Sequence, residues 1–195
     1  INTYMDVNGY HIRKTYLNDG FTELCTNLTA VINDTSGFNN DPVKFPVYIE
    51  TDEWIRIPIC YGQEHYGNPD LNLMHQGDDI NITFKLNLWE TQMIPVRSMI
   101  EAYNKYGGGI LSDRCGRGKT MMGCYLISYF KKKTLIIVHL DILFTQWIER
   151  LITAFGEEIR DYIGTIRGKV FDIEGKYIVI AMLKTISEPK RNYPE

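Results

Sequence analysis

The sequence predicts an α/β protein in which residues 87–195 form a parallel sheet with helices on both faces, after a small α+β module over residues 1–86. From Leu88 onward, short apolar runs alternate with segments of helical spacing, which is typical of a parallel sheet covered by helices. Before that point, short β-prone runs are cut by Gly, Asn, Asp and Pro. The charge also changes: residues 1–89 hold 5 Lys/Arg against 12 Asp/Glu, and the rest hold 16 against 12. Only the second part therefore has a charge that suits phosphate.

The first module is predicted to contain short strands and one helix. The residues expected to form strands are Val47–Ile49, Trp54–Ile57 and Ile80–Phe84. The segment Phe21–Ile32 has apolar residues at helical spacing and is expected to be a helix. No group of residues in this module indicates a particular reaction or function.

The second part is predicted to alternate helix and strand. Helices are expected at Glu90–Asn104, Lys119–Phe130 and Asp141–Ala154. Strands are expected at Ile110–Ser112, Thr134–Val138, Asp161–Ile166 and Tyr177–Ala181. The first of these strands would be short and buried, and it would lead into a glycine-rich loop.

That loop, Ser112–Thr120, reads Ser-Asp-Arg-Cys-Gly-Arg-Gly-Lys-Thr and has the composition of a phosphate-binding loop. Such a loop needs small residues so that backbone N–H groups can turn toward an anion. It also needs a Lys that reaches the β- and γ-phosphates, and a Ser or Thr hydroxyl for Mg²⁺. Gly116, Gly118, Lys119 and Thr120 meet these needs, although Asp113 occupies the first glycine position of the full motif. Its place between an apolar strand and a helix makes the short motif specific.

Hydrolysis of a bound nucleotide needs a further strand that ends in acids, one to hold Mg²⁺ and one to position water. Asp141 follows an apolar run, but it has no acidic neighbour and is interpreted as a helix N-cap. Asp172 and Glu174 fall in a turn. We therefore expect no such acidic pair within the 195 residues.

Composition excludes several classes of protein. The four cysteines lack the paired short spacing of a zinc site or a disulfide framework, which favours a reducing compartment. The first residues show no signal peptide, and the apolar runs are far shorter than the ~20 residues of a membrane span. The sequence is expected to be a piece of a longer protein.

The order and spacing of the motifs resemble the XPB-like branch of superfamily-2 helicases, in particular those of large cytoplasmic DNA viruses that are related to the poxvirus transcript-release helicase. The resemblance runs from about Gly9 to the last residue. Leu88–Gln92 stands where the family has Leu-Arg-Pro-Tyr-Gln, Cys115–Thr120 resembles motif I, and 132–150 is similar to the motif Ia region. Residues 163–176 and 177–187 match the stretches that follow.

The resemblance implies a partial RecA-like ATP-binding domain that stops before the DEAD/H box, with a second RecA-like domain beyond residue 195. It implies ATP and Mg²⁺ as cofactors, DNA or an RNA–DNA hybrid as partner, no membrane, and a cytoplasmic location, in a viral factory or virion. Lys119 and Thr120 would be catalytic, with Thr120 on Mg²⁺. The nucleotide contacts that it implies are Gln92, which would read adenine, Cys115, Gly116, Arg117, Gly118, Lys119, Thr120 and Met121. The contacts to the nucleic-acid backbone would be His139, Arg167, Lys184 and Thr185.

Departures from the family pattern leave an alternative open. Asp113-Arg114 replaces the usual small or apolar residue and Pro, and a carboxylate repels phosphate by about 4 kcal/mol at 4 Å with surface-like screening. Arg114 or Arg117 would neutralise it. The main expectation is a helicase motor fragment that binds Mg·ATP with little turnover. The alternative is a diverged module that binds nucleic acid or a protein without ATP. An unrelated P-loop kinase is disfavoured, because the sequence shows no arginine-bearing lid.

Overall fold

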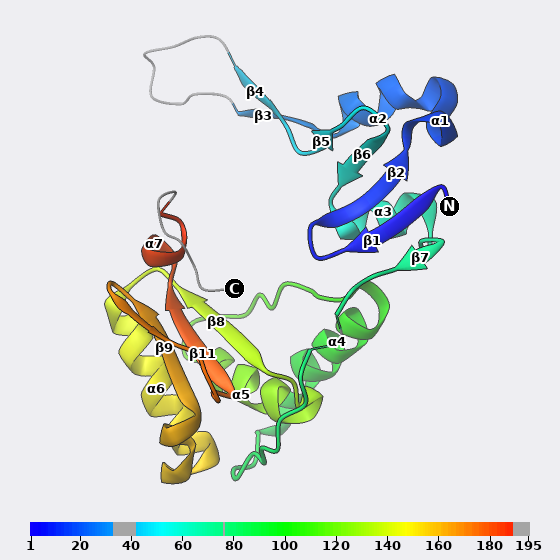
Figure 1. Cartoon of the computed structure of the whole chain (residues 1–195). Coiled ribbons are helices and arrows are strands. Elements are labelled where there is room, and N and C mark those ends of the chain that lie inside the picture. Colours follow the sequence, from blue (N-terminus) through cyan, green and yellow to red (C-terminus); the bar gives the residue numbers. More distant parts are fainter. Residues whose placement is uncertain (33–41, 76, 189–195) are drawn as a thin grey trace. The chain divides into compact units, whose positions relative to one another are not determined.

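The computed structural model describes residues 1–32, 42–75 and 77–188 (Figure 1). The chain forms two compact units, residues 1–76 and 77–195. This division falls ten residues before the predicted 86/87 boundary, because the start of the second unit is an extended segment that packs on that unit. Ile80 and Ile82 are buried there, and the Ile80 and Lys85 N–H groups donate to backbone carbonyls of Lys131 and Ala154.

The first unit is built on a five-stranded sheet in the order β5-β6-β2-β1-β7. Its strands are β1 (Thr3–Asp6), β2 (Gly9–Arg13), β5 (Ile49–Glu50), β6 (Trp54–Ile57) and β7 (Leu71–Asn72). Only the β1–β7 pairing is parallel. A separate two-stranded sheet joins β3 (Thr29–Ile32) to β4 (Val43–Pro46). The helices are α1 (Lys14–Leu17), the 3-10 turn Asn18–Gly20, α2 (Phe21–Asn27) and α3 (Ile59–Tyr66).

Burial alternates along β1 and β6, as expected for strands with one covered face. The buried side chains form one core with α2: Met5, Tyr10, Ile12, Leu24, Leu28, Ile55 and Ile57. Helix α3 lies on the same face, because a Cβ at its Gly62 would stand 2.3 Å from the Tyr10 ring. The other face of the sheet carries polar and aromatic side chains.

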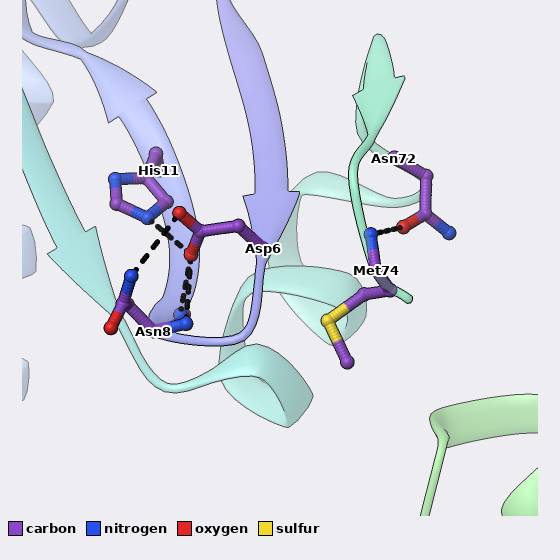
Figure 2. Close-up of polar contacts among 6 residues, drawn as sticks. Asp6, Asn8, His11, Asn72 and Met74 are labelled. Carbon is purple, nitrogen blue, oxygen red and sulfur yellow. Dashed lines mark hydrogen bonds and ion pairs between the residues drawn. The ribbon is translucent and has the colours of Figure 1, made fainter. Parts of the chain in front are cut away.

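The turn between β1 and β2 is fastened by the carboxylate of Asp6 (Figure 2). Asp6 Oδ1 accepts the backbone N–H groups of Asn8 (2.8 Å) and Gly9 (3.2 Å), and His11 Nε2 lies 2.9 Å away. Burial works against the charged carboxylate, but the hydrogen bonds from His11 and Asn8 outweigh it and hold the pKa of Asp6 below its ordinary value.

The helix predicted for Phe21–Ile32 is shorter in the structure. Helix α2 ends at Asn27, and Thr29–Ile32 turns into β3. The β-branched residues Thr29, Val31 and Ile32 pair with β4, so a non-local partner overrides the local helical spacing. The predicted strand Val47–Ile49 is displaced to Ile49–Glu50, whereas Trp54–Ile57 is confirmed.

The second unit has a four-stranded sheet in the order β10-β9-β11-β8. Its strands are β8 (Thr134–Val138), β9 (Ile163–Arg167), β10 (Val170–Asp172) and β11 (Ile178–Met182). Strands β8, β11 and β9 are parallel, and β10 is an antiparallel edge. The helices are α4 (Glu90–Tyr106), α5 (Lys119–Phe130), α6 (Asp141–Phe155), the 3-10 segment Glu157–Tyr162 and α7 (Leu183–Ile186).

Helices cover the second sheet unevenly. The main core packs α5 and α6 against one face of the sheet, with Cys124, Leu151, Ile178 and Ile180 buried at its centre. On the opposite face, Ile186 of α7 packs against Ile166, Val179 and Ala181. The arrangement is the predicted α/β class, a partial RecA-like domain that follows a small α+β unit in the sequence. No helix in the described part of the chain is long and apolar enough to cross a membrane.

Two predicted strands of this unit are wrong. Ile110–Ser112 is not a strand, and Ile110 is 94% exposed. A strand needs a hydrogen-bonded neighbour, and no strand of the described residues pairs with this segment. Ile80–Phe84 is extended but unpaired as a strand; the Phe84 N–H donates instead to the Ser128 hydroxyl.

Candidate nucleotide-binding site

The glycine-rich loop takes a conformation that its glycines permit. Gly116 and Gly118 have φ of +80° and +78°, in the left-handed region that side chains rarely adopt. Gly118 is the N-cap of α5. A Cβ on Gly118 would stand 2.4 Å from Gln92 Nε2, so a side chain here would have to displace the Gln92 amide as well as strain the backbone.

Lys119 places its ammonium group across the loop. Its Nζ donates to the backbone carbonyls of Asp113 (2.7 Å) and Arg114 (2.9 Å). These contacts fold the long side chain back over the residues that precede it. The positive charge is therefore held at the centre of the loop, where a phosphate would meet it.

The N-terminus of α5 is a second feature of the loop that favours binding of an anion. The helix begins at Lys119 and runs for 12 residues, with Met121 and Met122 donating their N–H groups to the Gly118 carbonyl. The first backbone N–H groups of a helix have no acceptor within it, and they carry the positive end of the helix dipole. The loop thus presents backbone donors and an ammonium group together.

Asp113 is partly neutralised within the loop. Its Oδ1 accepts the Arg114 N–H at 2.7 Å and lies 3.9 Å from Arg117 Nε. Of the two arginines that the sequence offered as partners, Arg117 supplies the ion pair and Arg114 supplies a backbone donor. The Arg117 side chain is 55% exposed, so solvent weakens this ion pair.

Gln92 ties the start of α4 to the loop. The residue is 7% exposed, and its Oε1 accepts the Trp89 N–H at 3.0 Å. Its Nε2 donates to the Arg117 carbonyl at 3.1 Å. The two backbone partners fix which end of the amide is oxygen and which is nitrogen. Whether it also reads a base stays a prediction.

A pocket of about 440 Å³ lies beside the loop. It is lined by Phe84, Leu86, Asn87, Leu88, Trp89, Gln92, Gly116, Gly118, Lys119, Thr120, Met121, Gln146 and Arg150. This size falls within the range of small-molecule sites, and its lining mixes apolar side chains with a few polar ones. The loop supplies one wall, and the segment before α4 supplies another.

The structure brings most of the predicted nucleotide contacts to this pocket. Gln92, Gly116, Gly118, Lys119, Thr120 and Met121 all line it, whereas Cys115 and Arg117 do not and are exposed. Sequence reasoning missed Phe84, Gln146 and Arg150. Gln146 and Arg150 lie one helical turn apart on α6, so their i, i+4 spacing was the available signal.

The four predicted nucleic-acid contacts lie after the parallel strands. His139 follows β8, Arg167 ends β9, and Lys184 and Thr185 lie in α7 directly after β11. The register pairs Met182 with Val138 and Ala181 with Ile166, so these carboxyl ends meet at one edge of the sheet. Ligands of open α/β sheets bind at that edge.

The side chains of Arg167 and Thr185 have partners within the protein. Arg167 Nη2 lies 2.9 Å from Asp141 Oδ1, and its guanidinium carbon lies 5.2 Å from the centre of the Phe144 ring. Thr185 is 7% exposed, and its Oγ1 accepts the Gly168 N–H at 3.1 Å. His139 and Lys184 are exposed.

Asp141 is not the N-cap that the sequence suggested. Leu140 is the N-cap, and Asp141 is the first residue of α6, where its carboxylate pairs with Arg167 and lies near the positive end of the helix dipole. No acid directly follows β8, β9 or β11 among the described residues. The part of the chain that the structure describes therefore offers no acidic pair at the edge where a nucleotide would react.

The residues present fit a magnesium nucleotide. The left-handed glycines leave a cradle that a Cβ at Gly118 would fill, and Lys119 supplies one positive charge for the phosphates. Thr120 lies next along the helix and lines the pocket, and a hydroxyl is a hard oxygen donor of the kind Mg²⁺ prefers. Trp89, Leu88 and Arg150 also line the pocket.

Residues 85–195 match the sequence profile of the family described as Type III restriction enzyme, res subunit (ResIII). The chain belongs to this family. The match begins at Lys85 and includes the whole loop and every pocket-lining residue except Phe84, so residues 85–195 form a nucleotide-binding module of the helicase type. The first unit lies outside the match.

One relative extends over both units. A protein of Acanthamoeba polyphaga mimivirus, whose name describes an ATP-dependent RNA helicase, is 28% identical over 191 residues. The alignment covers 95% of this chain and 36% of the relative. The chain thus spans about a third of the length of that relative.

Proposed function

We propose that this chain is the nucleotide-binding front part of an ATP-dependent superfamily-2 helicase that acts on DNA or RNA. The observation that carries the proposal is the Lys119 ammonium group, held by two loop carbonyls at the N-terminus of α5, directly after a loop with two left-handed glycines. The family match and the mimivirus relative support it.

In this proposal the 195-residue chain binds Mg·ATP but turns it over slowly. The backbone N–H groups of the loop and the α5 N-terminus hold the phosphates, and Lys119 moves from the loop carbonyls to the β- and γ-phosphates. Thr120 would supply a ligand to Mg²⁺, which would neutralise phosphate charge. Water activation is weak, because the described strands place no pair of carboxylates beside the pocket.

Nucleic acid would contact the edge formed by the ends of β8, β9 and β11. His139 and Lys184 are exposed there and can reach a phosphate directly. Arg167 must exchange its Asp141 partner for a phosphate, and Thr185 would contribute through the Gly168 backbone that it positions. The residues of the proposed nucleic-acid edge differ from those that line the nucleotide pocket.

The test is nucleotide binding by the Lys119→Ala variant, with Lys169→Ala as a matched control. Lys169 is an exposed lysine in the turn between β9 and β10, outside the pocket. We expect Mg·ATP affinity to fall by about 100-fold in Lys119→Ala, since the charge-assisted contact to the phosphates is lost, while the control binds normally. Circular dichroism checks that both variants fold. Unchanged affinity in a folded Lys119→Ala variant would refute the proposed nucleotide site.

The alternative is a diverged module that binds nucleic acid or a protein without ATP. The observation that favours it is Asp113, whose carboxylate stands in the loop with a long, exposed ion pair to Arg117. A folded wild-type chain that binds nucleic acid but shows no affinity for Mg·ATP at millimolar concentration would favour this alternative.

A finer assignment follows from the motif order. We infer that the parent protein is of the XPB-like type found in large cytoplasmic DNA viruses, with a second RecA-like domain that completes the motor and a cytoplasmic place of action. A role in transcription follows from the same assignment. Sequencing the encoding gene beyond codon 195 tests it, because an Asp-Glu-x-His strand and a second motor domain are then expected within the reading frame.

A further inference from the structure

The face of the first sheet opposite its core carries a mixed aromatic and basic surface. Pairing in register brings Tyr4 beside His11, His11 beside Arg56, and Arg13 beside Trp54. Antiparallel partners project to the same side of a sheet, so these five side chains share one face. We call it the outer face.

Two rings of the outer face form its surface layer. Tyr4 stacks flat over His11, with ring centres 4.1 Å apart and 9° between the planes. Trp54 meets Tyr4 edge to face, with ring centres 4.9 Å apart. Neither Tyr4 nor Trp54 belongs to the apolar core of this unit, and both are partly exposed. The layer is therefore aromatic and partly open to solvent.

Two guanidinium groups border these rings. The Arg13 guanidinium carbon lies 4.9 Å from the centre of the Trp54 ring. The Arg56 stem lies over Gly9, since a Cβ there would be 2.9 Å from Arg56 Cγ. These are two of the four Lys/Arg residues in the first unit, which is acidic as a whole. The carboxylate on this face, Asp6, is occupied by His11 and by the backbone of the turn (Figure 2).

We propose that the outer face binds single-stranded nucleic acid. Tyr4 and Trp54 would stack on bases, and Arg13 and Arg56 would contact the phosphates between them. Aromatic platforms next to positive charge recognise single strands because every base has a flat face and every linkage an anionic phosphate. A duplex hides its base faces, so it would bind more weakly. A peptide adding to the sheet would use the backbone of an edge strand, which this face does not offer.

The surface is independent of the nucleotide pocket and of the nucleic-acid edge of the second unit. None of its residues lines the pocket beside the phosphate loop, and it lies outside the family match. If this surface does not bind nucleic acid, the proposed nucleotide binding is unaffected. Conversely, Lys119→Ala would leave this surface intact.

The experiment measures binding of fluorescent 12-nucleotide oligo-dT and oligo-U, and of a duplex of the same length, to the full 195-residue chain. We expect Tyr4→Leu and Trp54→Leu each to weaken single-strand affinity by about tenfold, because base stacking on the ring is lost while apolar cover remains. Tyr16→Leu is the control, since Tyr16 is an aromatic residue of this unit that is 50% exposed and off the outer face. The two oligonucleotides show whether the 2′-hydroxyl matters.

A second readout separates phosphate contact from loss of structure. In the double variant Arg13→Gln/Arg56→Gln, the slope of log affinity against log salt should become shallower by about 1.4 units, since each phosphate contact contributes about 0.7. Ultraviolet crosslinking should attach the oligonucleotide to peptides containing Tyr4 or Trp54. Folded Tyr4→Leu and Trp54→Leu variants that keep wild-type affinity for both oligonucleotides overturn the proposal, and a protein partner then becomes the better occupant. Preference for the duplex overturns it as well.

Discussion

Gly118→Ala tests the geometry of the phosphate loop at its tightest point. The backbone at Gly118 has φ of +78°, and a left-handed residue with a Cβ costs about 1–2 kcal/mol. The new methyl group would also stand 2.4 Å from Gln92 Nε2, which donates to the Arg117 carbonyl. Loss of that hydrogen bond costs about 1 kcal/mol. Together these two costs predict that the loop conformation that binds phosphate is destabilised by about 2–3 kcal/mol. Nucleotide affinity should therefore fall by roughly 30- to 150-fold.

The assay is the anisotropy of a fluorescent ATP analogue with Mg²⁺, together with urea unfolding. Gly175→Ala is the control, since Gly175 also has a left-handed φ (+68°) but nothing within 4 Å of its Cβ position. It should lose stability through backbone strain and keep nucleotide affinity. In the double variant Gly118→Ala/Gln92→Ala the methyl group has room, so the double should lose less affinity than the two single variants added together. Equal affinities of Gly118→Ala and the wild type, or strict additivity with Gln92→Ala, would show that the loop does not hold this geometry.

Three further predictions follow from single groups. Replacing Asp113 by Ser should raise Mg·ATP affinity severalfold, because a carboxylate near the phosphates is removed; weaker binding measured in titrations would show that Asp113 helps to hold the nucleotide. Burial raises the pKa of the Cys124 thiol to about 12, so a thiol reagent should label the exposed Cys60 and Cys115 and spare Cys124 until the protein unfolds. Mg·ATP should slow the labelling of Cys115, and fast labelling of Cys124 in native protein contradicts its burial. The backbone N–H groups of Asn2 and Thr3 lower the pKa of Asp70, so its stabilising effect is present above its unfolded pKa of about 3.9 and is lost as the pH falls through the lower folded value. The stability difference between wild type and Asp70→Asn in urea unfolding should therefore shrink as the pH falls below about 3.9, and a difference that stays constant contradicts the shift.

The elements that the sequence predicted well are those defined by local rules. Helix α5 and strand β8 have the predicted bounds, because helical spacing sets the one and an apolar β-branched run sets the other. The glycines of the loop were found because they belong to a local motif, and both have the left-handed backbone that Gly adopts most readily.

The elements that it missed depend on partners far along the chain. Thr29–Ile32 is a strand because Val43–Pro46 pairs with it, and Ile110–Ser112 is not one because no described strand does. Arg150 and Gln146 line the pocket because α6 packs beside α5, and their i, i+4 spacing alone does not show that packing. The aromatic outer face required the register of three strands, whereas the sequence shows only scattered Tyr, Trp and Arg.

Hydrogen exchange of the backbone with and without Mg·ATP tests the central claim most directly. If the loop wraps the phosphates, exchange in a peptide covering residues 113–122 should slow on addition of Mg·ATP, because the N–H groups of the loop and of the α5 N-terminus become hydrogen-bonded. Peptides from the first unit should be unchanged, and Lys119→Ala should abolish the effect. Saturating Mg·ATP that leaves exchange over residues 113–122 unaltered in a folded chain would contradict the assignment of this loop as the nucleotide site.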